Sequence, residues 1–461
     1  MADLRHIAVI DIGKTNAKLA LVDLETLREI AVVTRPNIVL AGPPWAHFDA
    51  DGHWEFLLAS LKSFHKDYAI DAISITTHGA CIALIDKNHN LAAPILDYEH
   101  PIPEAIASDY DKLRPDFSQT GSPRLSGGLN VGAQLFFQFK KDPELFHRTH
   151  KIVGYPQYWG LRLTGELACD ATSIGCHTDL WQPQDRTFSE LVNSLGLRDK
   201  IAPIRKSNDI LGNISIDVAN KTGLSPSTPV AVGIHDSNAS LYPHILSQPK
   251  PFSVVSTGTW VVAMAVGGTP PRLAPNHDTL INVNAFGEPV PSARFMGGRE
   301  YERILAGQAA TPTPENITKV LETPLMLLPA VDPSTGPFQG QQMCWIGTEP
   351  QLGTGERAAA LSFYLAMMAN TCLSLIGADG PIIIEGPFAR NDEFKRMLIA
   401  ASGRAVIQSD ASTGTAIGAA LLFGKSTRKP RLVDATSAES PPLWKRYADQ
   451  WNRYSPPLEE K

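Results

Sequence analysis

The residues best suited to chemistry lie in a polar turn between two apolar runs near the start of the chain. Residues 7–10 and 19–22 are apolar, and between and beside them stand Asp11, Gly13, Lys14, Thr15, Asn16 and Lys18. Gly13 lets a ligand approach the backbone where a Cβ would clash. Backbone N–H groups, the Thr15 hydroxyl and two lysines suit an anion such as phosphate, and Asp11 suits Mg²⁺, directly or through water. For this stretch alone, an ordinary β-hairpin with a polar turn is the alternative.

A second turn of the same kind opens the second half of the chain. Residues 252–256 read as a strand, Thr257-Gly258-Thr259 as a polar turn and 260–266 as a returning strand. A plain β-turn is the simpler interpretation of this segment taken alone. Two copies of strand, Gly/Thr turn and strand predict two domains of similar core that face each other across a cleft and direct their turns at one ligand.

Length and composition set the class of protein. A chain of 461 residues is too long for one core. A net charge of −6 argues against nucleic acid as a partner. The five cysteines are odd in number and lack C-x-x-C spacing, which favours a reduced, cytoplasmic protein. We find no leader segment and no apolar run that approaches the length of a bilayer span, so no membrane partner is expected; a homodimer is one option for the assembly.

The spacing of apolar residues predicts an α/β protein. After the first hairpin we expect a strand at 30–33, a helix at 54–68, a strand at 70–76 and a hairpin from 81–85 to Leu91. Residues 101–196 are mostly helical in pattern, and a strand at 230–233 precedes another helix. Later elements are expected at 355–376 (helix), 381–385 (strand), 392–402 (helix), 405–407 (strand), 413–423 (small-residue helix) and 443–454 (helix). The predicted domains are 1–246 and 247–430, with a tail, 431–461, packed on or near the second.

Taken in series, several segments resemble the FGGY carbohydrate kinases of the actin/hexokinase-like superfamily. The two turns resemble the family's phosphate motifs, and Gly233-Ile-His235-Asp236 resembles the segment that carries the catalytic aspartate. Residues 150–172 resemble a signature around Leu163-Thr164-Gly165-Glu166, and 385–391 with 411–420 resemble the adenosine region. Rhamnulokinase-like sequences look most similar. The chain departs from the pattern at Lys14, where a small or hydroxyl residue is usual, at Lys18, where arginine is frequent, and at Gly386-Pro387, where glycines are usual.

The resemblance implies two ribonuclease H-like α/β domains and an ATP-dependent kinase that phosphorylates a hydroxyl of a small sugar, a ketose of the L-rhamnulose or L-fuculose kind. Asp236 would be the catalytic base, and Asp11 with Asp236 would hold Mg²⁺ through water. The ATP phosphates would contact Gly13, Lys14, Thr15, Asn16, Lys18, Gly258 and Thr259. The adenosine would contact Gly386, Phe388, Ala389 and Asn391. The sugar would contact His78, Gly79, Asp97, His235, Asp236 and Asn238.

Plainer interpretations exist for single residues and for the whole chain. Spacing alone explains Asp236 as a helix N-cap, His78 as a turn histidine, Phe388 as core and the two lysines as surface charges. A non-catalytic sugar or nucleotide sensor, or another actin-like ATPase, is the alternative function. Zinc binding by residues 169–179, a hydrolase triad at 235–240 and a Walker A motif are set aside, because the ligand spacing and flanking motifs are missing.

Overall fold

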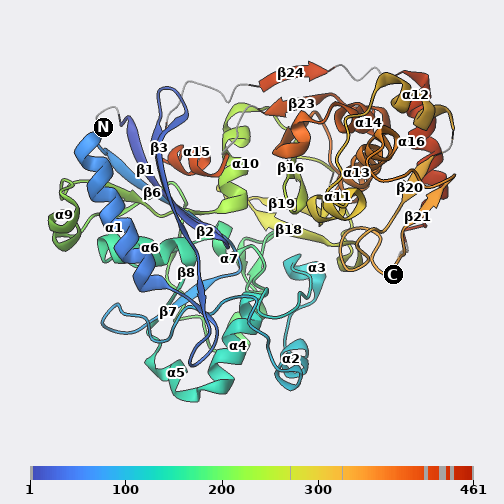
Figure 1. The fold of residues 1–461 in the computed structure, drawn as a ribbon. Coiled ribbons are helices and arrows are strands. Elements are labelled where there is room, and N and C mark those ends of the chain that lie inside the picture. Colours follow the sequence, from blue (N-terminus) through green and yellow to red (C-terminus); the bar gives the residue numbers. More distant parts are fainter. Residues whose placement is uncertain are drawn as a thin grey trace. The chain divides into compact units, whose positions relative to one another are not determined.

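The structure, a computed structural model, describes residues 4–269, 271–323, 325–409, 414–424 and 441–458, and the backbone of 432–436. The chain forms two compact units. Unit 1 contains Met1–Ser247, Ile281–Pro289 and Thr413–Lys429, and unit 2 contains Gln248–Leu280, Val290–Ser412 and Pro430–Lys461. Two segments that follow the predicted boundary at 246/247, namely 281–289 and 413–429, therefore belong to unit 1 (Figure 1).

Unit 1 is built on a seven-stranded mixed sheet. Its order is β13-β14-β6-β1-β2-β3, with β15 also paired to β6. β1 and β2 form the predicted hairpin, and β6 returns parallel to β1. The strands are β1 His6–Ile12, β2 Asn16–Asp23, β3 Arg28–Pro36, β6 Ala72–Thr77, β13 Ile210–Asn213, β14 Pro229–Ala231 and β15 Ile234–His235.

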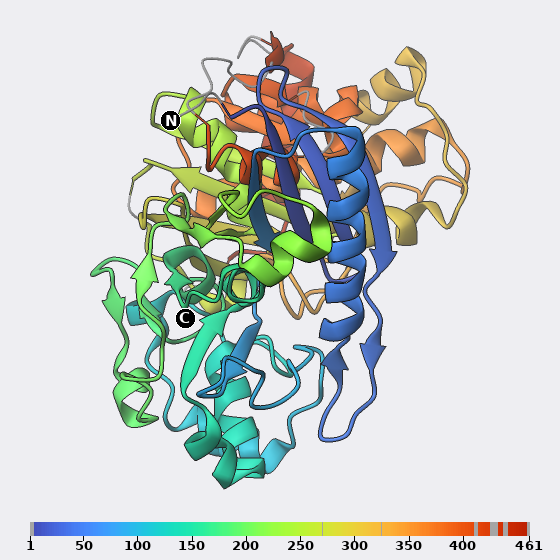
Figure 2. The same cartoon turned by 90° about the vertical axis from the view of Figure 1, so that its left-hand side faces the viewer.

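Both faces of this sheet are covered, which explains why β1 is apolar along its length. Ala8, Ile10 and Ile12 belong to one hydrophobic core, whereas Ile7 and Val9 belong to another. Successive side chains of a strand point to opposite faces, so a strand between two cores reads as a continuous apolar run. Helices α1 and α6 pack on the sheet at the first core, and α10 and α15 at the second (Figure 2).

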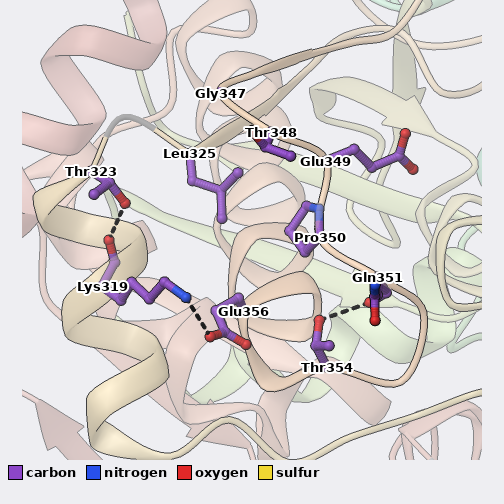
Figure 3. Close-up of a pocket in the computed structure, with 10 residues that line it drawn as sticks. All are labelled: Lys319, Thr323, Leu325, Gly347, Thr348, Glu349, Pro350, Gln351, Thr354 and Glu356. Atoms are coloured by element: carbon purple, nitrogen blue, oxygen red, sulfur yellow. Dashed lines mark hydrogen bonds and ion pairs between the residues drawn. The ribbon is translucent and has the colours of Figure 1, made fainter.

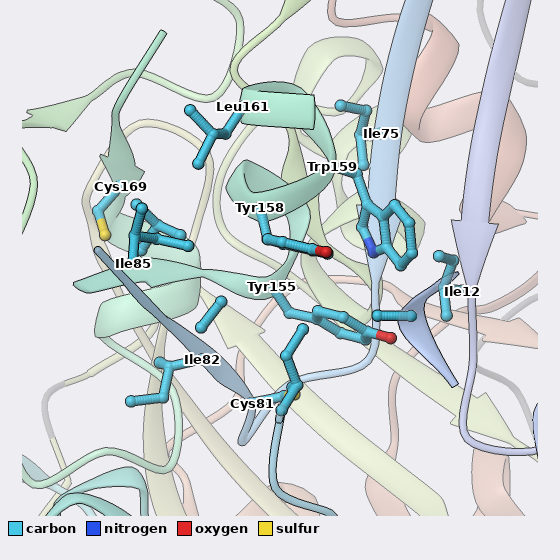
Figure 4. Close-up of a cluster of buried hydrophobic side chains, with 14 of the residues drawn as sticks. Ile12, Ile75, Cys81, Ile82, Ile85, Tyr155, Tyr158, Trp159, Leu161 and Cys169 are labelled. Carbon is cyan, nitrogen blue, oxygen red and sulfur yellow. The ribbon is translucent and has the colours of Figure 1, made fainter. Parts of the chain in front are cut away.

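Aromatic residues of α6 belong to the first core. Figure 4 shows Tyr155, Tyr158 and Trp159 packed beside Ile12 and Ile75 of the sheet.

The helices of unit 1 are α1 Ala50–Asp67, α2 Glu104–Asp111, α3 Phe117–Thr120, α4 Val131–Lys141, α5 Pro143–Arg148, α6 Tyr155–Thr164, α7 Ala171–Ile174, α8 Glu190–Ser194, α9 Ile216–Thr222, α10 Asp236–Ser247 and α15 Gly414–Ala420. Its short strands are β4 Val39–Leu40, β5 His47–Phe48, β7 Ile82–Ile85, β8 Lys151–Gly154, β9 Cys169–Asp170, β10 Trp181–Gln182, β11 Thr187–Phe188 and β12 Ile204–Arg205.

The small residues of α15 allow the close packing that the sequence predicts. A Cβ at Gly418 would overlap the carbonyl oxygen of Ala239 on α10. The predicted residues 411–413 lie outside the described part of the chain. Glycine is therefore required at 418 by the contact of two helices.

Unit 2 repeats the central arrangement of unit 1. Its seven-stranded sheet has the order β18-β19-β17-β16-β22-β23-β24. β16 and β17 form a hairpin, and β22 returns parallel to β16, as β6 does to β1. The strands are β16 Phe252–Thr257, β17 Val261–Val266, β18 Thr279–Val283, β19 Pro289–Phe295, β22 Ile382–Glu385, β23 Val406–Ser409 and β24 Leu432–Thr436, with β20 Met326–Leu328 and β21 Cys344–Ile346 forming a separate pair. Residues 281–283 of β18 and Pro289 of β19 are grouped with unit 1, although both strands belong to this sheet. The predicted α/β class with two similar cores is confirmed.

The helices of unit 2 include one that is long and apolar. They are η1 Pro275–His277, α11 Gly297–Leu305, α12 Pro314–Glu322, α13 Gly355–Leu375, η2 Pro387–Arg390, α14 Asp392–Ser402 and α16 Pro442–Tyr454. By length and composition alone α13 could cross a membrane, so the prediction that no apolar run approaches that length is wrong. Its most apolar window is 78% buried within the structure, as in a core helix. Helix α16 of the predicted tail packs into the core of unit 2 through Trp444, Tyr447 and Trp451.

A second prediction is wrong in part. The expected hairpin from 81–85 to Leu91 is reduced to an isolated bridge between Ile85 and Leu91. Strand β7 instead pairs antiparallel with β8, which follows much later in the chain. An apolar run identifies a strand but not its partner.

Candidate functional site

The carboxyl ends of three parallel strands lie side by side in unit 1. Ile12 of β1 pairs with Thr77 of β6, and Thr77 also pairs with His235 of β15. Residues that follow such strands emerge at one edge of the sheet, the usual place for ligands in α/β folds. The turn after β1, His78 after β6 and Asp236 after β15 are brought together in this way. The backbone N–H of His78 donates to the Ile12 carbonyl at 2.8 Å.

Asp236 is the first residue of α10, and its two carboxylate oxygens have different surroundings. Oδ1 accepts a hydrogen bond from the Ser237 backbone N–H at 2.6 Å and lies 3.1 Å from His235 Nε2. Among the described residues we find no partner for Oδ2. Burial alone would raise the pKa of Asp236, but His235 holds it below its usual value. Oδ2 is thus a charged acceptor on a side chain that is 33% exposed.

His235 is fully engaged within unit 1. Its Nε2 faces Asp236, and its Nδ1 lies 3.2 Å from Asn238 Nδ2. Burial alone would lower the pKa of His235, but the hydrogen bond and charge of Asp236 raise it to about 10. A Cβ at Gly79 would lie 2.5 Å from His235 Nε2, so Gly79 leaves room for the imidazole. The geometry makes His235 a positioning partner of Asp236.

His78 lies in an aromatic enclosure with one unused nitrogen. Its ring centroid is 5.0 Å from that of Phe48, 5.4 Å from Tyr98 and 5.1 Å from Tyr155. Nδ1 lies 2.9 Å from the Gly79 carbonyl oxygen, whereas Nε2 is buried and has no partner among the described residues. Burial lowers the pKa of His78, so the ring is neutral. The carbonyl fixes the proton on Nδ1 and leaves Nε2 as an acceptor.

The two lysines of the first turn are both paired with carboxylates. Lys14 forms ion pairs with Asp97 and Glu99. Lys18 Nζ lies 3.1 Å from Asp11 Oδ2 and 3.2 Å from Glu29 Oε1. Both were predicted to bind phosphate, yet the structure directs their charges to acidic side chains of unit 1.

The Asp11 side chain is 13% exposed, and the charge of Asp236 acts on it. Burial raises the pKa of Asp11, Lys18 opposes this shift, and the charge of Asp236 adds to it. In the described part of the chain, no group of three or more His, Cys, Asp or Glu residues could hold a metal ion. Two nearby carboxylates, each with a cationic partner, fit a magnesium ion that keeps most of its waters and takes other ligands from phosphate.

Two hydrogen bonds from Asn37 hold the backbone of the first turn. The Asn37 side-chain amide donates to the Gly13 carbonyl at 2.8 Å, and the Asn37 backbone N–H donates to the Thr15 carbonyl at 2.9 Å. Thr15 and Asn16 are exposed. The turn therefore has a fixed shape with its polar groups accessible.

Unit 2 has a matching turn. Thr259 is exposed, and Gly258 is partly exposed, between β16 and β17. The Thr257 hydroxyl donates to the Glu385 carbonyl at 2.5 Å and accepts from the Phe388 N–H at 3.1 Å. These bonds join the turn to the segment after β22, which carries the predicted adenosine residues.

The four predicted adenosine residues are close in sequence, but their surroundings differ. Phe388 and Ala389 are buried, and Phe388 packs against Tyr301 and Phe394. Asn391 caps α14 by accepting from the Phe394 N–H at 2.9 Å, and its amide donates to Ser362. Gly386 is exposed, has a φ of +82°, and a Cβ there would overlap the Thr257 carbonyl. Each of these four residues thus has a role within the fold.

Gly13 and Gly258 differ from the other glycines whose surroundings the structure describes. Each of the others has a positive φ or a neighbour that a Cβ would crowd. At Gly13 the nearest atom to a built Cβ is the Asn16 carbonyl oxygen at 3.5 Å, and at Gly258 it is the Trp260 carbonyl oxygen at 3.7 Å. Neither has a φ in the left-handed region. The fold itself does not require glycine at either turn.

Comparison with known proteins decides the family. The description "FGGY family of carbohydrate kinases, N-terminal domain" matches residues 6–242, and "Carbohydrate kinase FGGY, C-terminal domain" matches residues 249–431. The chain belongs to the FGGY family of carbohydrate kinases. It is similar over 97% of its length to a solved carbohydrate kinase from Novosphingobium aromaticivorans, with 36% identity, a TM-score of 0.90 and 98% of that chain covered.

Named relatives are more distant. An L-fuculokinase from Salmonella typhi is 26% identical over 270 residues, which is 57% of each chain. A probable L-xylulose kinase from Haemophilus influenzae is 26% identical over 269 residues, 56% of this chain and 55% of its own. The chain thus spans little more than half the length of these relatives. A xylulose kinase from Lactobacillus acidophilus has 16% identity and a TM-score of 0.78, with 98% of this chain and 96% of that chain covered, and so shows the fold alone.

The segment 150–172, which resembles a family signature, is hydrogen-bonded to β15, the strand that precedes Asp236. Buried Asp170 accepts hydrogen bonds from the Thr172 and Ser173 backbone N–H groups, the Ser207 hydroxyl and the Gln157 amide. The Thr172 hydroxyl in turn accepts from the His235 N–H at 3.0 Å. Sequence analysis gave Asp170 no role, although its position before a short helix is typical of an N-cap.

A separate hollow of about 440 Å³ lies in unit 2, and none of the predicted site residues line it. It is bordered by the end of α12, the start of α13 and residues 347–351 (Figure 3). There Lys319 Nζ lies 3.1 Å from Glu356 Oε1. The α13 N-terminus at its border is capped by the Thr354 side chain, which accepts from the Arg357 N–H.

Proposed function

We propose that the protein is an ATP-dependent carbohydrate kinase that transfers the γ-phosphate of ATP to a hydroxyl of a small ketose, of the L-rhamnulose or L-fuculose kind. Two acceptors that have no partner among the described residues carry the proposal: Oδ2 of Asp236 and Nε2 of His78, which follow strands that end at the same edge of the sheet. The family and the named ketose kinases among the relatives support it.

Asp236 would act on the acceptor hydroxyl. Its Oδ2 would accept the hydroxyl proton as the oxygen attacks phosphorus. His235 donates from Nε2 to Oδ1, which fixes the carboxylate and holds its pKa below the usual value. His78 and Asp97 would orient the sugar, with Asn238 supporting His235.

The phosphates would be held mainly by backbone groups. Gly13 with Thr15 and Asn16 in unit 1, and Gly258 with Thr259 in unit 2, present open turns without a Cβ at the glycine. We propose that the adenosine binds near Gly386 in unit 2. Asp11 and Asp236 would hold magnesium through water, and the ion would supply charge neutralisation at the phosphates.

Replacing Asp236 by Asn separates catalysis from helix capping. Asparagine caps a helix as well as aspartate does, so a capping role predicts an active D236N variant. If Asp236 is the catalytic base, we expect kcat to fall by about 10²- to 10⁴-fold in D236N. The affinity for ATP is expected to stay within a few fold of the wild-type value. The matched control is Asp217→Asn, an exposed aspartate in the first turn of α9.

The assay measures ADP release with and without a panel of rhamnulose, fuculose, xylulose, ribulose and fructose isomers. Sugar-dependent turnover by the wild type and its loss in D236N support the proposal. Binding without turnover would indicate a sensor, and turnover that no sugar stimulates would indicate another ATPase of this fold.

A further inference from the structure

Lys14 lies in the turn between β1 and β2, which resembles a phosphate-binding motif. Its side chain, however, contacts acidic residues that follow later in unit 1. Its Nζ forms an ion pair with Asp97 and lies 3.1 Å from Glu99 Oε2. The same atom is 4.6 Å from the centroid of the Tyr98 ring and 5.3 Å from that of Phe48. The aromatic enclosure of His78 therefore also contains the Lys14 ammonium.

We propose that Lys14 recognises the sugar and sets which neutral polyols are accepted, and that it is not a ligand of the nucleotide phosphates. This inference rests on the function proposed above. It assigns Lys14 to the acceptor side of that reaction.

The first argument is the pattern of donors and acceptors. An ammonium has three N–H donors, and Asp97 and Glu99 use two of them. The Lys14 ammonium and the His78 ring both lie against Phe48 and Tyr98, and Nε2 of His78 is an acceptor without a partner among the described residues. A donor and an acceptor between aromatic faces suit neighbouring hydroxyl groups on an otherwise apolar carbon chain.

The second argument is charge. One ammonium beside the two carboxylates Asp97 and Glu99 leaves a net negative group. A triphosphate is not attracted to such a group, and Lys14 would have to leave both carboxylates to reach one. The same balance disfavours sugar acids and sugar phosphates as acceptors. The expected substrate class is therefore an uncharged ketose or polyol.

The test is sugar and nucleotide binding to the full chain, measured separately by calorimetry. We expect K14M and K14Q to weaken binding of the best sugar by about 10- to 100-fold, the loss expected for one hydrogen bond from a charged donor. The affinity of both variants for ADP is expected to stay within about threefold of the wild-type value. The matched control is K221M, which removes a lysine that is paired 2.7 Å from Asp217 on the exposed face of α9; it is expected to change neither.

A second arm uses charge. We expect the affinity for D-gluconate to be at least tenfold lower than the affinity for the best ketose. We expect D97N to reduce this difference in affinity, because the substitution removes one negative charge. Unchanged sugar binding in K14M and K14Q, or a loss of ADP binding alone, overturns the assignment. The proposed function fails separately, when the wild type binds sugar but transfers no phosphate; in that case the loss of sugar binding in K14M still supports the role of Lys14.

Discussion

Glu300 of α11 should make the stability of unit 2 depend on pH. Its side chain is buried, with 1% of its surface exposed. Oε1 accepts from the Asp332 N–H at 3.0 Å, and Oε2 accepts from the Tyr364 hydroxyl at 3.1 Å. Burial raises the pKa of Glu300 from 4.5 to about 7, because these hydrogen bonds offset only part of the loss of hydration.

The sign of the effect follows from the raised pKa. Between pH 4.5 and 7 the folded state holds a proton that the unfolded state has released, so stability falls as pH rises. The difference between a pKa of 4.5 and one of about 7 corresponds to about 3 kcal/mol, because each pH unit is worth about 1.36 kcal/mol. This contribution is fully present below pH 4.5 and is lost as pH rises through 7.

Replacing Glu300 by Gln removes the titration, keeps an acceptor for the Asp332 N–H, and places an amide donor opposite the Tyr364 hydroxyl oxygen. We expect the difference in unfolding free energy, E300Q minus wild type, to increase by about 3 kcal/mol between pH 4.5 and 8. Urea unfolding at a series of pH values gives this difference, and hydrogen exchange of α11 and α13 places it in unit 2. The control is Glu315→Gln, at an exposed position on α12. Parallel pH profiles for wild type and E300Q would refute the reasoning.

Three further substitutions test the packing of unit 1 and its first turn. Gly13→Ala should leave the melting temperature unchanged, because no atom lies nearer than 3.5 Å to the new Cβ, yet raise the KM for ATP about tenfold or more; an unchanged KM would remove the turn from phosphate binding. Gly418→Ala should destabilise unit 1 by about 1–3 kcal/mol, since its Cβ would overlap the Ala239 carbonyl; thermal unfolding checks this, and wild-type stability would contradict it. Asp11→Ala should raise the Mg²⁺ concentration for half-maximal turnover by about tenfold or more; an unchanged titration would count against its role.

The elements near the site could be predicted because each is defined by local pattern. Helix α14 was predicted at 392–402, and it spans Asp392–Ser402. The hairpins β1–β2 and β16–β17 were found from apolar runs on either side of a short polar turn. The parallel return of β6 to β1 places His78 at the edge of the sheet, and that position follows from strand order.

Contacts between distant segments could not be predicted in the same way. β7 was predicted as a strand, but its partner β8 lies beyond four helices. Lys14 was grouped with its neighbours in sequence, whereas its carboxylate partner Asp97 is 83 residues away. A lysine side chain is long and flexible, so its position in a turn does not fix where its charge lies.

Motif glycines show how the structure separates roles that the sequence cannot. Gly79 and Gly386 are explained within their own units, the first by the His235 ring and the second by its positive φ and the Thr257 carbonyl. Gly13 and Gly258 have neither explanation. A glycine lowers the stability of the folded state because it makes the unfolded chain more flexible. Where the fold does not require glycine, its presence needs another explanation. Close approach of a ligand to the backbone is such a reason, and it applies to the same turn in each unit.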